Sequence, residues 1–154
     1  DSATSGKWVE LENLHFTYNF LGDVDEHKFE EVKAALKPYI RQYNSEIFLR
    51  GMSLFPNLKR ARVLVINVDN PSGDVVEVQK AMTRELEQVG FEPEKRKFRP
   101  HATLQRIKSS KTGELKEAIE KYRGYDFGMM PSFSVDLIRS ELTKMGPVYT
   151  RVKI

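Results

Sequence analysis

FRPHATLQR, the stretch from Phe98 to Arg106, decides how the rest of the sequence is interpreted. It has the pattern of a β-strand in which His101 and Thr103 lie two positions apart, so that imidazole and hydroxyl point to the same face. The same H-x-T triplet occurs once more, at His15-Phe16-Thr17. With three histidines and seven threonines in the chain, any one histidine should meet a threonine at this spacing roughly one time in 20. The repetition therefore predicts a common function for the two triplets.

The first triplet lies in a stretch, 14–21, that alternates between polar and apolar residues. His15, Thr17 and Asn19 fall on one side of this alternation, and leucine or aromatic residues fall on the other. Such a pattern is typical of a strand with one polar face. Because His15 and His101 are far apart in the sequence, we expect each to lie in its own half of the molecule.

Length and composition indicate the broad class of protein. The chain has 154 residues, 40% of them hydrophobic and 31% charged, which fits one globular domain or two small lobes that share a core. No run of residues has the length and apolarity of a membrane span, and the first residues do not resemble a signal peptide. The absence of cysteine excludes disulfides and thiolate metal sites and fits a reducing, cytoplasmic location.

The charge distribution is more informative than the net charge of +3. No acidic residue occurs between Lys95 and Lys111, a segment that includes the second triplet and seven basic residues: Lys95, Arg96, Lys97, Arg99, Arg106, Lys108 and Lys111. A positive field beside His101 favours an anionic substrate such as a phosphate. The alternative is a solvated basic loop.

Periodicity predicts an irregular alternation of strands and helices. Expected strands cover 7–10, 14–21, 47–54, 62–68, the His101 stretch, 133–142 and 148–154, and expected helices cover 26–43, 75–89 and 113–122. Pro38 should shorten or kink the first helix, and Gly146-Pro147 should form a turn. This order favours an α+β fold with antiparallel sheets over a doubly wound parallel sheet.

Two imidazoles and two hydroxyls beside basic residues are a suitable set for phosphodiester chemistry. Histidine can act as acid or base near neutral pH, while threonine hydroxyls and Arg106 can hold phosphate oxygens. Each residue has a structural alternative: a strand histidine or threonine can serve the sheet alone, and Phe20 can belong to the core. A zinc site on His15 and His101 lacks a third ligand at a recognisable spacing. His27, among charged residues of the first expected helix, is interpreted as a surface residue.

The sequence resembles the two-histidine phosphoesterases, specifically the RNA 2′,3′-cyclic phosphodiesterases, also called 2′-5′ RNA ligases. The resemblance runs from about Lys7 to the C-terminus and covers five motifs: WVE at 8–10, NLHFTYNFLG at 13–22, FPN at 55–57, PHATLQR at 100–106 and GPVY at 146–149. Tyr18 departs from the leucine that is usual in the family at that position. The family also usually carries a strand and a helix ahead of the first motif, and these are expected to be absent from this sequence, which begins almost at the motif. Either the sequence is incomplete at its N-terminus or the first lobe is built differently.

The resemblance implies one α+β domain over residues 1–154. It is bilobal, with two pseudo-symmetric antiparallel sheets that face a central groove and with helices on the outside. It implies His15 as the acid that protonates the departing 3′ oxygen and His101 as the base that activates water. Thr17, Thr103 and Arg106 become phosphate contacts, and Phe20 becomes a ring on which a base stacks.

The implied reaction is hydrolysis of RNA 2′,3′-cyclic phosphate ends to 2′-phosphomonoesters without metal or cofactor, and the same acid and base would also support reversible 2′-5′ RNA ligation. The implied partner is an RNA with such an end, or a nucleotide, and no membrane. We expect mostly monomer, with self-association if the N-terminus is truly short, because an uncovered sheet edge can pair with another chain. The alternative from another class is a non-catalytic nucleotide- or RNA-binding module that uses the same groove.

Overall fold

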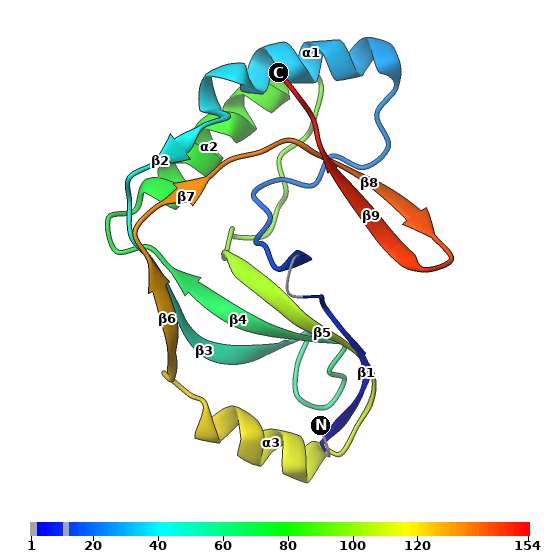
Figure 1. Ribbon diagram of the computed structural model, residues 1–154, viewed down its shortest axis with the longest axis vertical. Coiled ribbons are helices and arrows are strands. Elements are labelled where there is room, and N and C mark those ends of the chain that lie inside the picture. Colours follow the sequence, from blue (N-terminus) through cyan, green and yellow to red (C-terminus); the bar gives the residue numbers. More distant parts are fainter. Residues whose placement is uncertain (1–2, 11–12) are drawn as a thin grey trace. The chain divides into compact units, whose positions relative to one another are not determined.

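The computed structural model describes residues 3–10 and 13–154. It has three α-helices and antiparallel sheets in these residues, which confirms the α+β prediction (Figure 1). The chain forms two compact units. In the described residues, unit 1 comprises 3–10, 13–18, 47–71 and 99–130, and unit 2 comprises 19–46, 72–98 and 131–154. No helix in these residues is both long and apolar enough to cross a membrane.

Unit 1 is built on a five-stranded antiparallel sheet in which β5 lies between β1 and β4 (Figure 1). The sheet order is β1-β5-β4-β3-β6, with β1 at Thr4–Trp8, β3 at Ile47–Phe55, β4 at Val63–Asp69, β5 at His101–Ser110 and β6 at Asp126–Met130. The helix α3, Thr112–Lys121, follows β5. The predicted strands 47–54 and 62–68 and the predicted His101 strand are thereby confirmed.

The core of unit 1 lies on one face of this sheet. Leu64 of β4 and Ile107 of β5 form a buried cluster with Ala61 and with Leu115 of α3. The helix therefore packs its apolar side on the sheet face that carries Leu64 and Ile107. Val65, which points to the opposite face, is also fully buried, so β4 is covered on both faces, as its unbroken apolar sequence predicts.

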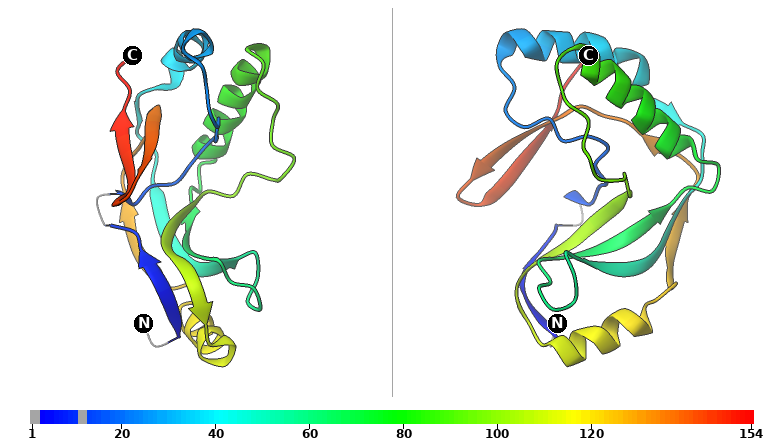
Figure 2. Two further views of the ribbon diagram at one scale, coloured as in Figure 1. Left: turned by 90° about the vertical axis from the view of Figure 1, so that its right-hand side faces the viewer. Right: turned by 180° about the vertical axis from the view of Figure 1, so that it is seen from behind.

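Unit 2 holds α1 (Glu26–Leu36) and α2 (Asp74–Gln88), which pack side by side (Figure 2). Their buried residues recur at helical spacing: Val32, Leu36, Val75, Met82 and Leu86. Two short ladders complete the unit, β2 (Gln42–Tyr43) with β7 (Phe133–Ser134) and β8 (Ile138–Thr143) with β9 (Gly146–Arg151). Tyr43 and Phe133 stack face to face at 4.9 Å between ring centroids.

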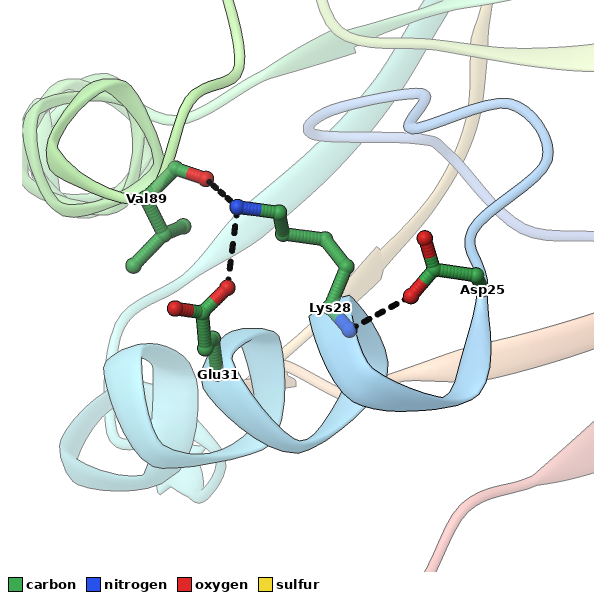
Figure 3. A network of polar contacts seen from close by, with 4 residues as sticks. All are labelled: Asp25, Lys28, Glu31 and Val89. Carbon is green, nitrogen blue, oxygen red and sulfur yellow. Dashed lines mark hydrogen bonds and ion pairs between the residues drawn. The ribbon is translucent and has the colours of Figure 1, made fainter.

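Polar contacts fasten the start of α1 to the end of α2 (Figure 3). Asp25 Oδ1 accepts a hydrogen bond from the Lys28 backbone nitrogen at 2.8 Å and so caps the helix, as predicted. Lys28 Nζ donates to the Val89 carbonyl at 2.8 Å and lies 2.9 Å from Glu31 Oε2. Lys28 lowers the pKa of the Glu31 carboxyl through its hydrogen bond to that carboxyl and through its positive charge. A cation thus satisfies a carbonyl that the end of α2 leaves without a helical partner.

Two predicted elements end or divide earlier than expected. The first helix stops at Leu36 and continues only as the 3-10 helix η2, Lys37–Tyr39, because Pro38 cannot donate a hydrogen bond to a continuing α-helix. The predicted strand 133–142 is two strands, β7 and β8, which pair with different partners.

The turn between β8 and β9 also differs from the prediction. Thr143 pairs with Gly146, so the turn residues are Lys144 and Met145. Gly146 has a positive φ of 108°, and Met145 N donates to Thr143 Oγ1 at 3.2 Å. Gly146 thus lies at the start of β9, where a glycine accommodates this backbone angle more readily than other residues.

Candidate active site

The second H-x-T triplet lies at the beginning of β5. Pro100 precedes it, and its carbonyl accepts a hydrogen bond from Val68 N at 3.1 Å, which ties the entry of β5 to β4. In the β4–β5 ladder, His101 is opposite Asn67 and Thr103 is opposite Val65. Directly paired residues point to the same face, so His101 and Thr103 lie on the sheet face opposite the Leu64–Leu115 core.

A β-bulge brings Arg106 to this same face. In a regular strand, Arg106 would point away from His101, because five positions separate them. However, Leu64 pairs with Gln105 and Val65 pairs with Thr103, so Leu104 is an extra residue in β5. Arg106 is then opposite Val63, which shares its face with Val65. The bulge therefore places the arginine in line with the histidine and the threonine.

The first triplet reaches β5 through a single backbone bridge. Phe16 forms an antiparallel bridge with Ala102. Continuing this register by one residue on each side puts His15 opposite Thr103 and Thr17 opposite His101. Cross-strand partners at such positions have Cβ atoms about 5 Å apart. The bridge thus sets the middle residues of the two triplets side by side, and a continued register would put both histidines and both threonines on one face.

This placement corrects two predictions. The strand expected at 14–21 is wrong except for the bridge at Phe16, because β1 already pairs with residues 105–110 of β5 and leaves only the start of β5 open on that edge. The expectation that each triplet lies in its own half is also wrong, since both belong to unit 1.

Both imidazoles make the same hydrogen bond. His15 Nδ1 lies 2.5 Å from the carbonyl oxygen of Asn13, and His101 Nδ1 lies 2.8 Å from that of Arg99. In each case the carbonyl belongs to the residue two positions earlier. Because a carbonyl can only accept, Nδ1 must carry the proton, and Nε2 holds the lone pair of the neutral ring. In each ring, Nε2 is therefore the nitrogen left for proton transfer.

Phe55 contacts one of these rings. Its centroid is 5.0 Å from that of His101, with the ring planes tilted by 55°. Phe55 pairs with Val63 in the ladder and so shares the face of His101. On the same face, Ser53 Oγ donates to Asn67 Oδ1 at 3.0 Å, beside His101. Sequence reasoning assigned Phe55 no role, and its only signal was its place in the FPN motif.

The other residues singled out in the sequence, Phe20, Asn19 and His27, all belong to unit 2. Phe20 belongs to unit 2 and is 79% exposed, so it is not a core residue. Asn19 also belongs to unit 2, where its Nδ2 donates to Thr83 Oγ1 at 3.0 Å, so the polar face of the first triplet ends at Thr17. His27 is exposed on α1, as predicted. Within residues 3–10 and 13–154, no three His, Asp or Glu side chains group together as metal ligands would.

The face can perform acid–base chemistry on a bound anion. Together the two triplets and Arg106 offer two imidazoles with the same Nδ1 contact, two hydroxyl donors and a guanidinium. The basic segment identified in the sequence divides between the units, and its part from Arg99 onward belongs to unit 1. A phosphate held by the hydroxyls would have a potential base and a potential acid beside it.

The chain is similar in sequence to several proteins of known name. A relative from Methanothermobacter thermautotrophicus named RNA 2′,3′-cyclic phosphodiesterase is 38% identical over 150 residues, which cover 96% of this chain and 80% of the relative. One of the same name from Aquifex aeolicus is 37% identical, over 99% of this chain and 82% of the relative.

Solved structures show the same fold. A crystal structure of a Thermus thermophilus protein matches with a TM-score of 0.71 and 25% identity, over 96% of this chain and 79% of that one. E. coli LigT in complex with 3′-AMP matches with a TM-score of 0.69 and 22% identity, over 96% and 79% of the two chains. The family model described as LigT like Phosphoesterase matches residues 1–65 and 66–149. The chain therefore belongs to the LigT-like phosphoesterase family.

Proposed function

We propose that this protein is an enzyme that hydrolyses RNA 2′,3′-cyclic phosphate ends to 2′-phosphomonoesters, without a metal ion. The observation that supports the proposal is the Phe16–Ala102 bridge, which joins the middle residues of the two H-x-T triplets. The names of the relatives from M. thermautotrophicus and A. aeolicus support the choice of substrate.

In the proposed reaction, His101 Nε2 takes a proton from water as the water oxygen attacks phosphorus. The bond between phosphorus and the 3′ oxygen breaks, and His15, which acts in the imidazolium form with both nitrogens protonated, donates its Nε2 proton to that oxygen. The products are a 2′-phosphomonoester and a free 3′-hydroxyl, so atoms and charge balance. Thr17 and Thr103 donate hydrogen bonds to the non-bridging oxygens, on which charge builds in the transition state. Arg106 adds a cationic phosphate contact.

The same groups support ligation. If the 5′-hydroxyl of a second RNA replaces water, the same acid and base yield a 2′-5′ phosphodiester and a free 3′-hydroxyl. Phe20, whose exposed ring can stack on a base, completes the proposed set of substrate contacts.

The experiment is an end-product assay in EDTA. An oligonucleotide with a 2′,3′-cyclic phosphate end is incubated with the protein, and the isomer of the product is identified. The proposal predicts turnover to the 2′-phosphate, equal activity in His27→Ala and loss of activity in His15→Ala and His101→Ala. A 3′-phosphate product would overturn the assigned leaving group. Binding of the oligonucleotide without turnover would instead favour a non-catalytic RNA-binding module.

A further inference from the structure

Two cations face each other next to the candidate active site. Lys7 of β1 is directly opposite Arg106 of β5 in the antiparallel ladder, and both side chains are exposed. In the part of the chain that the structure describes, neither forms an ion pair. Like charges directly opposite each other destabilise a sheet. An anion bound between them would remove this cost.

The pair lies on the reactive face but at a distance from the histidines. Because Arg106 shares the face of His101 and Thr103, its ladder partner Lys7 does too. Because Leu104 is a bulge residue, Thr103 and Arg106 are opposite Val65 and Val63, only two residue steps apart on β4, or about 7 Å at the usual rise of about 3.3 Å per residue. This span exceeds the width of one phosphate group. A phosphate held at the two histidines therefore leaves Lys7 to contact a different anionic group.

We propose that Lys7 binds the phosphodiester on the 5′ side of the reacting end, next to the phosphate that Arg106 contacts, an inference that rests on the proposed function. A 2′,3′-cyclic phosphate is the 3′ terminus of its strand, so every other phosphate of the substrate lies on its 5′ side. A nucleoside 2′,3′-cyclic monophosphate has no such group. Lys7 thus selects an RNA strand over a mononucleotide, and it acts as a charge that an arginine can replace.

Binding of a product oligonucleotide tests this without turnover. A fluorescent oligonucleotide ending in a 2′-phosphate is titrated with wild type and with Lys7→Gln at several salt concentrations. We expect Lys7→Gln to weaken binding about tenfold, the usual effect of losing one charge-assisted contact. The slope of log affinity against log salt should fall by about 0.7, since one phosphate contact to a single strand is lost.

Matched variants define the site. Lys116→Gln removes the same charge from α3, which packs on the opposite sheet face through Leu115, and should bind like wild type. Lys7→Arg should keep tight binding. Equal weakening by Lys7→Gln and Lys116→Gln would reduce the effect to net charge and overturn the proposal, as would unchanged binding in Lys7→Gln.

Kinetics separate this inference from the proposed function. The ratio of kcat/KM for a cyclic-phosphate oligonucleotide to that for the nucleoside 2′,3′-cyclic monophosphate should fall about tenfold in Lys7→Gln and stay constant in Lys116→Gln. An unchanged ratio would refute the Lys7 site while leaving the proposed function intact. If wild type hydrolysed neither substrate, the proposed function would fail, and the binding experiment would still decide whether Lys7 contacts an upstream phosphate.

Discussion

The two H-x-T triplets are held by backbones of very different regularity. His101 and Thr103 belong to β5, which pairs with β4 on one side and with β1 further along the other side. His15 and Thr17 lie outside any strand and join the sheet only where Phe16 bridges Ala102. Both histidines nevertheless make the same Nδ1 contact with a carbonyl two residues earlier.

The difference separates what the chemistry requires from what the fold requires. A reacting phosphate needs two similarly oriented imidazoles, and one bridge with a local hydrogen bond is enough to orient His15. The stability of the sheet instead depends on β4 and β5, whose side chains form the buried core. Mutations should therefore affect activity symmetrically in the two triplets and affect stability asymmetrically.

The largest expected effect is on the two histidines. His15→Ala and His101→Ala should each lower kcat/KM by roughly 10²–10⁴-fold, because a positioned acid or base contributes that much. With a nitrophenyl phosphodiester, whose leaving group needs no protonation, His15→Ala should recover much of its loss and His101→Ala should not. The reverse pattern would exchange the two roles, and full activity in both variants would refute the mechanism.

The second largest effect should be a difference in the free energy of unfolding between variants of the two regions. Leu64→Ala, at a position only 4% exposed in β4, should lower the free energy of unfolding by about 2–5 kcal/mol. Phe16→Ala should cost about 1 kcal/mol, because Phe16 is half-buried and lies outside the strands. Urea unfolding of both variants gives the comparison. A larger loss for Phe16→Ala would mean that the first triplet is part of the stabilising core.

The two threonines should again behave alike. Thr17→Val and Thr103→Val keep the shape of the side chain and remove one hydroxyl donor each. Each should lower kcat/KM by about 10- to 100-fold, the value of a hydrogen bond to a charged group. Kinetics of both single variants test the symmetry, and a loss confined to Thr103→Val would show that the first triplet contributes only its histidine.

The smallest effect should come from Phe55, which supports only the His101 triplet. Phe55→Leu removes the ring contact with His101 and should lower kcat about two- to tenfold with little change in KM, in keeping with the usual worth of an aromatic pair. Phe127→Leu removes a ring from β6 of the same sheet and is the control. Equal losses in the two variants would make the effect one of general packing.

Much of the fold follows from sequence periodicity. The starts of all three helices and the central strands β3, β4 and β5 were predicted, because their apolar spacing and the cap at Asp25 are local signals. The strand β6, with sequence DFGMM, was missed because it has no alternation and contains a glycine. The predicted strand at 14–21 failed because alternation describes two faces but does not supply a hydrogen-bonding partner along the whole length.

The site was predictable in its residue types and less so in its geometry. The repeated H-x-T triplet pointed to His15 and His101, whose catalytic roles stay predictions. That Arg106 shares their face depends on the bulge at Leu104, which arises from pairing between β4 and β5 and leaves no trace in local sequence. The contact between Phe55 and His101 is likewise a product of strand order, so no spacing rule could reveal it.

The central claim is that His15 and His101 act on one phosphate. The most direct measurement is an imidazole ¹H–¹⁵N NMR titration with a nucleoside 2′-phosphate, the product of the proposed reaction. We expect the ring signals of His15 and His101 to change along a single binding curve while those of His27, exposed on α1, stay unchanged. A response of only one of the two rings, or two curves with different dissociation constants, would contradict the account.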